Sequence, residues 1–140
     1  MADFIVEGTR LACQEWHETE AAYRTGAFRP GIEAYLAWER QGMLRYFVAF
    51  DEGKIIGHTA FIVYPSRTTT GLEATEEFVF IAPEHRKGWR GVQLVADAIE
   101  FIKLQGVGDI FVGSKLTARK PIDKLLERLG GRHVANLYVF

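Results

Sequence analysis

The sequence from residue 75 to residue 103 reads TEEFVFIAPEHRKGWRGVQLVADAIEFIK, and this stretch decides the fold. It opens with a short run of apolar, β-branched and aromatic residues, which is typical of a buried strand. It closes with four apolar residues at helical spacing, which predicts an amphipathic helix whose inner face is formed by Val95, Ala98, Ile99 and Ile102.

A basic turn with two glycines, at residues 83–91, joins the strand to the helix. A strand that enters a helix through such a turn directs free backbone N–H groups and the positive end of the helix dipole at one place. We expect that place to bind an anion, above all a phosphate. The alternative is an ordinary strand-to-helix connection whose basic residues are simply solvated.

The composition is that of an ordinary globular domain. The 140 residues are 48% hydrophobic and 25% charged, which predicts one domain over residues 1–140 with a substantial core. The net charge of −1 gives no general attraction to nucleic acid or membrane, and the small basic cluster at residues 86–90 is thin evidence for a nucleic-acid site. No apolar run approaches the roughly 20 residues of a membrane span, and no signal-peptide pattern is present. We therefore expect a cytoplasmic protein.

Neither cysteine nor histidine chemistry is indicated. Cys13 is the single cysteine and cannot form an internal disulfide. The histidines lack metal-ligand spacing, so no metal site is expected.

The chain before the central stretch predicts two helices and two strands. Residues 4–6 are ambiguous and could form a short edge strand. A helix is expected over residues 9–24, with an apolar face of Ala12, Trp16, Thr19 and Tyr23, and a second short helix is closed by Gly42. Strands over residues 43–50 and 55–64 flank a turn at residues 51–54, and with the central strand at residues 72–82 they should form an antiparallel meander.

The chain after the central helix predicts a strand, a helix and a last strand. The strand at residues 107–113 should lie parallel to the central strand through a right-handed crossover. The helix begins near Pro121 and buries Ile122, Leu125, Leu126 and Leu129, and residues 133–140 form the final strand. The expected fold is α/β (α+β), with a mixed, mostly antiparallel sheet and helices on both faces.

Residues 83–91 resemble the coenzyme A pyrophosphate loop of the GNAT superfamily of N-acyltransferases, Arg/Gln-x-x-Gly-x-Gly/Ala between a strand and a helix. Arg86 takes the first position and Gly91 the last, while Trp89 stands at the middle glycine and Gly88 lies one residue early. The order of elements is also similar to that family over nearly the whole chain, except that the first strand is short or missing. The sheet edge it would cover could pair with a second copy of the chain.

The resemblance implies that the central strand and the next parallel strand splay apart around the pantetheine arm of acetyl-CoA. The backbone groups that would bond this arm, and polarise the acyl carbonyl, belong to Val79, Phe80, Ile81 and Ala82. The pyrophosphate would lie on the amides of Arg86, Lys87, Gly88, Trp89, Arg90 and Gly91, with Arg86, Lys87 or Arg90 adding charge. The Trp89 indole would either lie on the cofactor or fill the gap between helix and sheet.

An amine must be neutral to attack a thioester, and since a lysine amine has a pKa of about 10.4, the site needs a base. Glu76 and Glu77 lie on the central strand, where alternation should send them to opposite faces and give Glu77 the parity of Val79 and Ile81. In the resembling family a glutamate here relays the proton. The alternative is that one carboxylate is paired structurally and the other is exposed, and the sequence does not choose between them.

The general acid of the resembling family is a tyrosine on the helix after the parallel strand. Leu126 stands at that position here, with Arg119 and Ile122 at the family's asparagine and alanine positions. Water, Tyr138 or another group would then protonate the leaving thiolate, or no transfer takes place.

The resemblance as a whole implies an acetyl-CoA-dependent N-acetyltransferase that acetylates a primary amine of a small molecule or peptide by direct attack in a ternary complex, without a metal. Leu126 and Trp89 motivate the alternative, a non-catalytic GNAT-fold binding or assembly protein such as a phage accessory protein. The loop also resembles small phage-encoded members. Acidic residues of the helix pair could favour a cationic amine or form a solvated face, namely Glu15, Glu18, Glu20 and Glu39.

Overall fold

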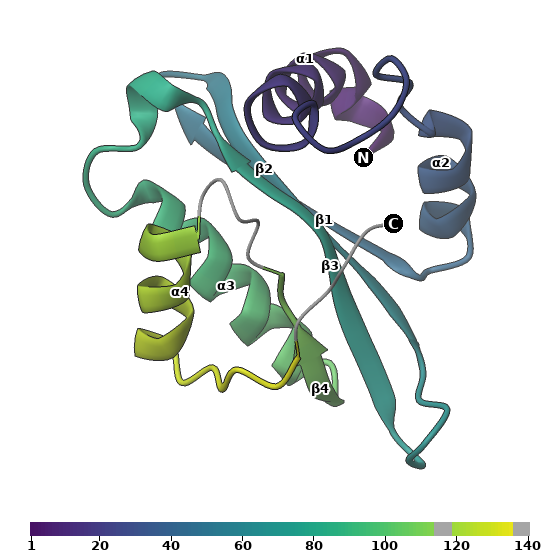
Figure 1. The fold of residues 1–140 in the computed structure, drawn as a ribbon. Helices are drawn as coiled ribbons and strands as arrows, with labels where there is room; N and C mark the ends of the chain where they lie inside the picture. Colours follow the sequence, from purple (N-terminus) through teal and green to yellow (C-terminus); the bar gives the residue numbers. More distant parts are fainter. Residues whose placement is uncertain (114–118, 136–140) are drawn as a thin grey trace.

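The computed structural model describes residues 1–113 and 119–135 of the chain, with the side chains of residues 119–122 left aside. Helices cover both faces of a sheet (Figure 1). In chain order the described elements are η1 (Ala2–Phe4), α1 (Ile5–Glu15), η2 (Trp16–Glu20), α2 (Ile32–Arg40), β1 (Leu44–Asp51), β2 (Lys54–Pro65), β3 (Leu72–Ile81), η3 (Pro83–His85), α3 (Arg90–Leu104), β4 (Val107–Phe111) and α4 (Arg119–Arg128).

The strands lie in the order β1-β2-β3-β4. β1 pairs with β2 and β2 with β3 in antiparallel fashion, and β3 pairs with β4 in parallel. The predicted meander and the crossover through α3 are therefore confirmed, as is the mixed, mostly antiparallel class. Within the described residues β1 is an outer strand, and its pairing with a second copy stays a prediction.

α3 covers one face of the sheet with the apolar residues that its sequence predicts. Val95, Ala98 and Ile102 are buried, and Ile99 packs against them. Ala98 and Ile102 pack with side chains from three strands, namely Phe61, Val63, Ala74 and Val107. Removing this apolar surface from water stabilises the unit by about 25 cal/mol per Å², so this burial holds α3 against the sheet.

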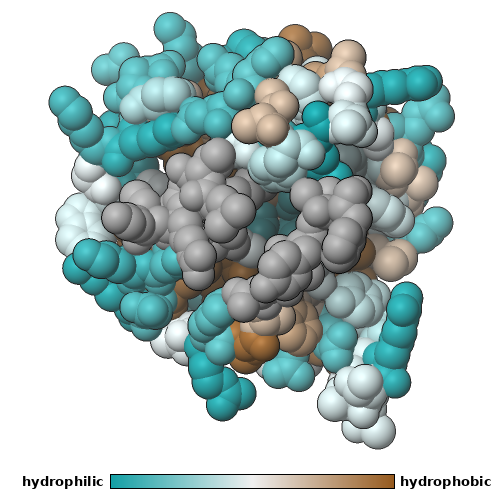
Figure 2. Space-filling view, viewed as in Figure 1, coloured by the Kyte–Doolittle hydropathy of each residue, from teal (hydrophilic) through white to brown (hydrophobic). Residues whose placement is uncertain are grey.

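α1 and α2 cover the opposite face (Figure 1). Leu11 of α1 packs with Phe80 and Ile55, while Tyr35 and Trp38 of α2 pack on Leu44, Ala60 and Ile62. Hydrophilic residues occupy much of the surface in Figure 2, and hydrophobic residues reach it in smaller areas.

The N-terminal helix corrects two expectations. Residues 4–6 form no strand, because a 3-10 turn leads directly into α1 at Ile5. Of the expected apolar face only Thr19 is fully buried, while Ala12 and Trp16 are half-buried and Tyr23 is exposed. The other buried residues are Gly8, Leu11 and Glu15. A Cβ on Gly8 would lie 2.6 Å from the Tyr46 hydroxyl, so this face is the one that approaches the sheet closely.

The C-terminal region agrees with the expected helix. α4 ends at Arg128, with Leu125, Leu126 and Leu129 half-buried around its end. Residues 133–135 have no regular structure, and the rest of the expected final strand, including Tyr138, lies outside the described residues.

Candidate active site

β3 has two halves with different neighbours. Its first half pairs with β4, from Leu72 opposite Val107 to Thr75 opposite Phe111. Its second half continues to Ile81 and pairs with β2 alone among the described strands. Among the described residues, one edge of this second half therefore has no partner strand, in agreement with the expected splaying of the parallel pair.

A β-bulge separates these halves. Ala60 of β2 lies opposite Phe78, but its neighbour Phe61 lies opposite Glu76, so Glu77 is the additional residue. The predicted parity of Glu77 with Val79 and Ile81 is thereby broken, because Glu77 and Phe78 both contact Tyr35 of α2. The Tyr35 hydroxyl lies 3.4 Å from the Glu77 carboxylate, and the Tyr35 and Phe78 ring centres are 6.0 Å apart. Bulges of this kind redirect side chains and are frequent beside active sites.

Of the four residues whose backbone groups were predicted to bond the co-substrate, Val79 to Ala82, only two direct these groups towards the free edge of β3. The Ala82 N–H donates to the Ile56 carbonyl at 2.8 Å, and the Ala82 carbonyl accepts from the His85 N–H at 2.8 Å. By antiparallel alternation the backbone groups of Phe80 also point towards β2, and those of Val79 and Ile81 point away from it. Val79 and Ile81 are thus the residues whose backbone could bond a ligand in the gap.

Arg86 turns back onto the protein. Its Nε donates to the Ile81 carbonyl at 2.8 Å, and its two terminal nitrogens hold the Glu18 carboxylate at 2.5 and 2.7 Å. The guanidinium carbon also lies 5.1 Å from the centre of the Phe80 ring. This bidentate pair fastens the loop to the segment after α1.

Arg90 is held in a similar way by the last residue of β1. Its Nη2 donates to Asp51 at 2.8 Å, and the Nδ1 of His85 lies 3.3 Å from the other oxygen of the same carboxylate. The two arginines that were expected to add charge at the loop are therefore both engaged by carboxylates. The sequence did not show these partners because they lie 68 and 39 residues away from the arginines.

The groups that face outward at this loop are Lys87 and the first amides of α3. Lys87 is exposed and has no hydrogen bond or ion pair within the described part of the chain. Gly88 has a φ of +88°, a left-handed conformation that favours glycine. No described side chain caps α3, and Gln93 supplies the first N–H that bonds back, to the Trp89 carbonyl at 2.8 Å. The amides before it are available to an anion.

The Trp89 indole lies outside the gap between α3 and the sheet. Its side chain is 76% exposed. Gly91 occupies the close approach instead, since a Cβ there would lie 3.4 Å from Ile81 Cγ1. The indole therefore leaves the end of β3 open.

The two glutamates of the bulge differ in their surroundings. Glu76 accepts a hydrogen bond from the Gly113 N–H at 3.0 Å and so connects β3 to the chain just beyond β4. Glu77 is exposed and accepts from the Tyr35 hydroxyl. Burial, reinforced by the negative charge of Glu77, raises the pKa of Tyr35 to about 12, so this hydroxyl stays protonated and can donate. Sequence reasoning missed Tyr35, because only the fold brings it to the bulge.

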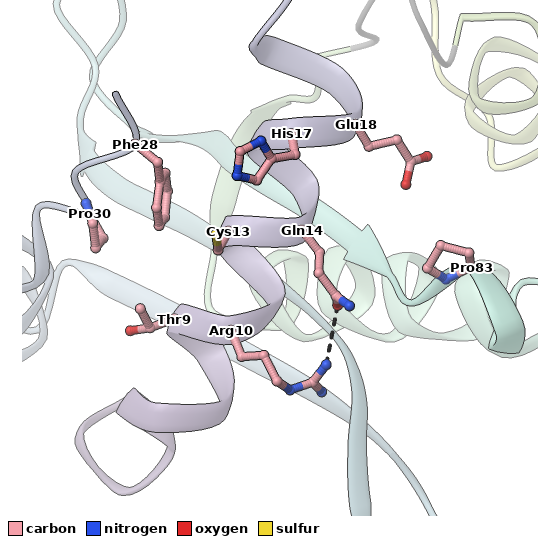
Figure 3. Close-up of a pocket in the computed structure, with 9 residues that line it drawn as sticks. All are labelled: Thr9, Arg10, Cys13, Gln14, His17, Glu18, Phe28, Pro30 and Pro83. Carbon is pink, nitrogen blue, oxygen red and sulfur yellow. Dashed lines mark hydrogen bonds between the residues drawn. The ribbon is translucent and has the colours of Figure 1, made fainter. Parts of the chain in front are cut away.

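A pocket of about 510 Å³ adjoins Glu77. It is lined by Trp38, Met43, Ile62, Tyr64, Pro65, Arg67, Thr75 and Glu77. A larger groove of about 800 Å³ runs along the outer side of α1 towards Pro83 (Figure 3). It contains none of the predicted site residues, although Glu18 at its rim is the partner of Arg86. The smaller pocket is therefore the one beside the candidate chemistry.

No group of three or more metal-ligating side chains occurs within the described residues. In the same part of the chain no helix combines the length and apolar character needed to cross a membrane.

Comparisons with known proteins agree with the observed fold. The sequence profile of the Acetyltransferase (GNAT) family matches residues 10–130. Curated protein sequences give no match. A putative acetyltransferase from Pyrococcus furiosus superimposes with a TM-score of 0.75 at 18% identity, over 99% of this chain and 93% of the other. An aminoglycoside acetyltransferase from an uncultured soil metagenomic sample gives a TM-score of 0.76 at 17% identity, over 99% and 91%.

A second soil metagenomic aminoglycoside acetyltransferase, solved in complex with sisomicin, gives a TM-score of 0.72 at 17% identity over 97% of this chain and 87% of the other. At these identities the solved structures establish a shared fold, and the profile match establishes the family. The chain belongs to the GNAT acetyltransferase family.

Proposed function

We propose that the protein transfers an acetyl group from acetyl-CoA to a primary amine by direct attack within a ternary complex. One observation carries this proposal. Within the described residues, one edge of β3 has no partner strand from Glu76 to Ile81, and this edge leads to the N-terminus of α3, which no described side chain caps. An extended chain that ends in a pyrophosphate fits such a path, because it needs backbone partners along its length and an anion site at its end.

The residues along this path match the two parts of the co-substrate. The backbone groups of Val79 and Ile81 would bond the pantetheine amides, except that the Ile81 carbonyl is shared with Arg86. The first amides of α3 and the Lys87 ammonium would hold the pyrophosphate. We assign Arg86 and Arg90 to the shape of the loop, since their carboxylate partners already compensate their charge.

Glu77 is our candidate general base. It lies at the bulge, is exposed, and is oriented by the Tyr35 hydroxyl. In the proposed step the amine nitrogen attacks the thioester carbonyl, the carbon–sulfur bond breaks, and the proton lost by nitrogen passes to the Glu77 carboxylate, directly or through water. The thiolate takes its proton from water, because Leu126 stands where the family's tyrosine is expected. The two aminoglycoside acetyltransferases among the structural neighbours support an amine as the acceptor.

Release of free thiol from acetyl-CoA, measured with a panel of primary amines, tests this function. We expect amine-dependent release, and calorimetric binding of acetyl-CoA by the protein without an amine. If calorimetry shows no binding of acetyl-CoA or CoA at millimolar ligand, the proposed function is refuted.

A second candidate function is a GNAT-fold binding or assembly protein that has lost transfer chemistry. Two observations favour it: both loop arginines are engaged by the protein itself, and a leucine stands at the expected acid position. Turnover with any amine of the panel excludes this alternative. Tight binding of CoA without turnover supports it.

A further inference from the structure

The pocket beside Glu77 is built mainly from apolar and aromatic side chains. We propose that it binds the acceptor, and that the acceptor is a primary monoamine on an aromatic or branched apolar body, of the kind represented by phenethylamine. This inference rests on the proposed function. It names the substrate class and sets it apart from polycationic amines such as aminoglycosides.

The position of the pocket relates it to the transfer site. Thr75 is the last β3 residue paired with β4, and Glu77 is the bulge residue, and both line the pocket. The pocket therefore opens on the α2 side of β3 at the point where the unpartnered edge begins. An amine inside it would have its nitrogen next to the candidate base and next to the start of the proposed path of acetyl-CoA.

The walls suit a flat, apolar body. Trp38 packs edge-on against Tyr35, with ring centres 5.4 Å apart and an interplanar angle of 84°. The Tyr64 hydroxyl is bonded to the Thr75 hydroxyl at 2.8 Å, so its polar end is already satisfied. Met43, Ile62 and Pro65 complete the lining, and the volume of about 510 Å³ lies within the range of small-molecule sites. Rigid aromatic walls favour an aromatic guest, and an indole also attracts a cation.

The charges in the pocket favour a single ammonium group. Glu77 is its only carboxylate among the described lining residues, and Arg67 at the rim brings one positive charge. The two formal charges cancel, so one ammonium can pair with Glu77 while further ammonium groups would approach Arg67 unfavourably. Glu15 and Glu20 act electrostatically on the Tyr35 hydroxyl, but they do not line this pocket.

Thiol release from acetyl-CoA with phenethylamine, spermidine and kanamycin, by wild type and variants, tests the inference. We expect kcat/KM for phenethylamine to exceed that for the polycations by about tenfold or more, the value of one good apolar contact. Trp38→Ala should raise KM for phenethylamine more than it changes kcat. Arg67→Glu, in an exposed loop, should shift the preference towards spermidine by about tenfold, because it reverses one pocket charge. Tyr23→Ala and Arg132→Glu, exposed and outside the pocket, are the matched controls.

The outcomes separate this inference from the proposed function. The inference is overturned if the enzyme prefers spermidine or kanamycin and if neither Trp38→Ala nor Arg67→Glu changes that preference. The proposed transfer reaction would still be supported by this result. If no amine is turned over, calorimetry with phenethylamine and CoA-saturated protein decides. Binding that is lost in Trp38→Ala and kept in Tyr23→Ala supports the pocket and refutes transfer, and absence of binding overturns the inference.

Discussion

The two halves of β3 belong to one continuous strand but have different neighbours. Leu72–Thr75 has partner strands on both sides, and its backbone belongs to the sheet. The segment from Glu76 to Ile81 has β2 on one side and no described partner strand on the other. The pairing with β4 ends at Thr75, and the additional residue Glu77 follows two positions later, where the register with β2 shifts.

This comparison teaches that a site can arise from a change in pairing. We call the segment from Glu76 to Ile81 the open half of β3, and the segment Leu72–Thr75 the closed half. The backbone of Val79 and Ile81 lies along the free edge of the open half, and the bulge turns the Glu77 carboxylate towards α2. In the proposed function the segment paired on both sides holds the strand in place, and the segment from Glu76 to Ile81 would bind the co-substrate. Changes that act on one half and spare the other test this division.

The largest effect should come from the two neighbouring carboxylates. Glu77→Gln removes the proposed base and should lower kcat by about 10²- to 10⁴-fold while leaving the fold intact. Glu76→Gln keeps an oxygen that can accept from the Gly113 N–H and should change kcat far less. Single-turnover kinetics with both variants measures the difference, and equal losses would contradict the assignment of Glu77.

The stability contributed by His58 on β2, beside the second half of β3, should depend on pH. His58 lies opposite Phe80, is 1% exposed, and is bonded at Nδ1 to the Tyr46 hydroxyl at 2.9 Å. Burial, assisted by the positive charge of Arg10, lowers the pKa of His58 to about 4. The unfolded chain takes up this proton below about pH 6.5 and the folded chain does not. The free energy of unfolding should therefore fall as pH drops from about 6.5 to 4, by at most about 1.4 kcal/mol per pH unit.

Urea unfolding of wild type and His58→Gln across this pH range measures that contribution. The difference between the two proteins isolates His58 from the carboxylates that also titrate. His17→Gln, at an exposed position on η2, should keep the wild-type slope. If His58→Gln and wild type show parallel pH dependences, His58 is not held neutral in the fold.

A methyl group added next to the open half of β3, at Gly57, should destabilise the protein more than one added next to the closed half, at Gly108. A Cβ on Gly57 would overlap Ile81 Cδ1 and lie 2.8 Å from the Phe80 carbonyl oxygen, whereas one on Gly108 would lie 3.8 Å from the Leu72 carbonyl oxygen. Gly57→Ala should cost about 1–3 kcal/mol of unfolding free energy and also weaken CoA binding, because it displaces the open half. Gly108→Ala should be tolerated. Thermal unfolding together with CoA titration checks both variants. If Gly57→Ala is as stable and binds CoA as well as Gly108→Ala, the prediction for the open half is contradicted.

The smallest effect should be at the loop cations. Lys87→Ala should weaken CoA binding by about 1 kcal/mol without changing the free energy of unfolding, since it removes a charge that the described structure leaves exposed. Lys103→Ala, exposed in the last turn of α3, is the control. Arg86→Ala should lower both affinity and stability, because it breaks the pair with Glu18. A Lys87→Ala protein that binds CoA as wild type does would place the pyrophosphate elsewhere.

The sequence predicted the parts of this fold that depend on local pattern. The apolar run of β3, the helical face of Ala98 and Ile102, and the turn residue Gly88 all follow from spacing and backbone preference. The face of α1 did not, because its close approach at Gly8 is set by Tyr46, on a distant strand.

The sequence indicated which segment forms the candidate site, but it did not indicate the contacts that its side chains make. The strand-to-helix turn indicated an anion site, but nothing in two adjacent glutamates shows that Glu77 is a bulge residue. The engagement of Arg86 by Glu18 depends on contacts across 68 residues. Such pairs have no local signature, and so residues that looked suited to bind an anion proved to bind the protein itself.

Amide hydrogen exchange with and without CoA tests the central claim most directly. We predict slower exchange on CoA binding at Val79, Ile81 and the first amides of α3. Ala82 should be unchanged, because its N–H is already bonded to Ile56. CoA binding that leaves Val79 and Ile81 unprotected, or no binding at all, would contradict the claim that the open half of β3 receives the co-substrate.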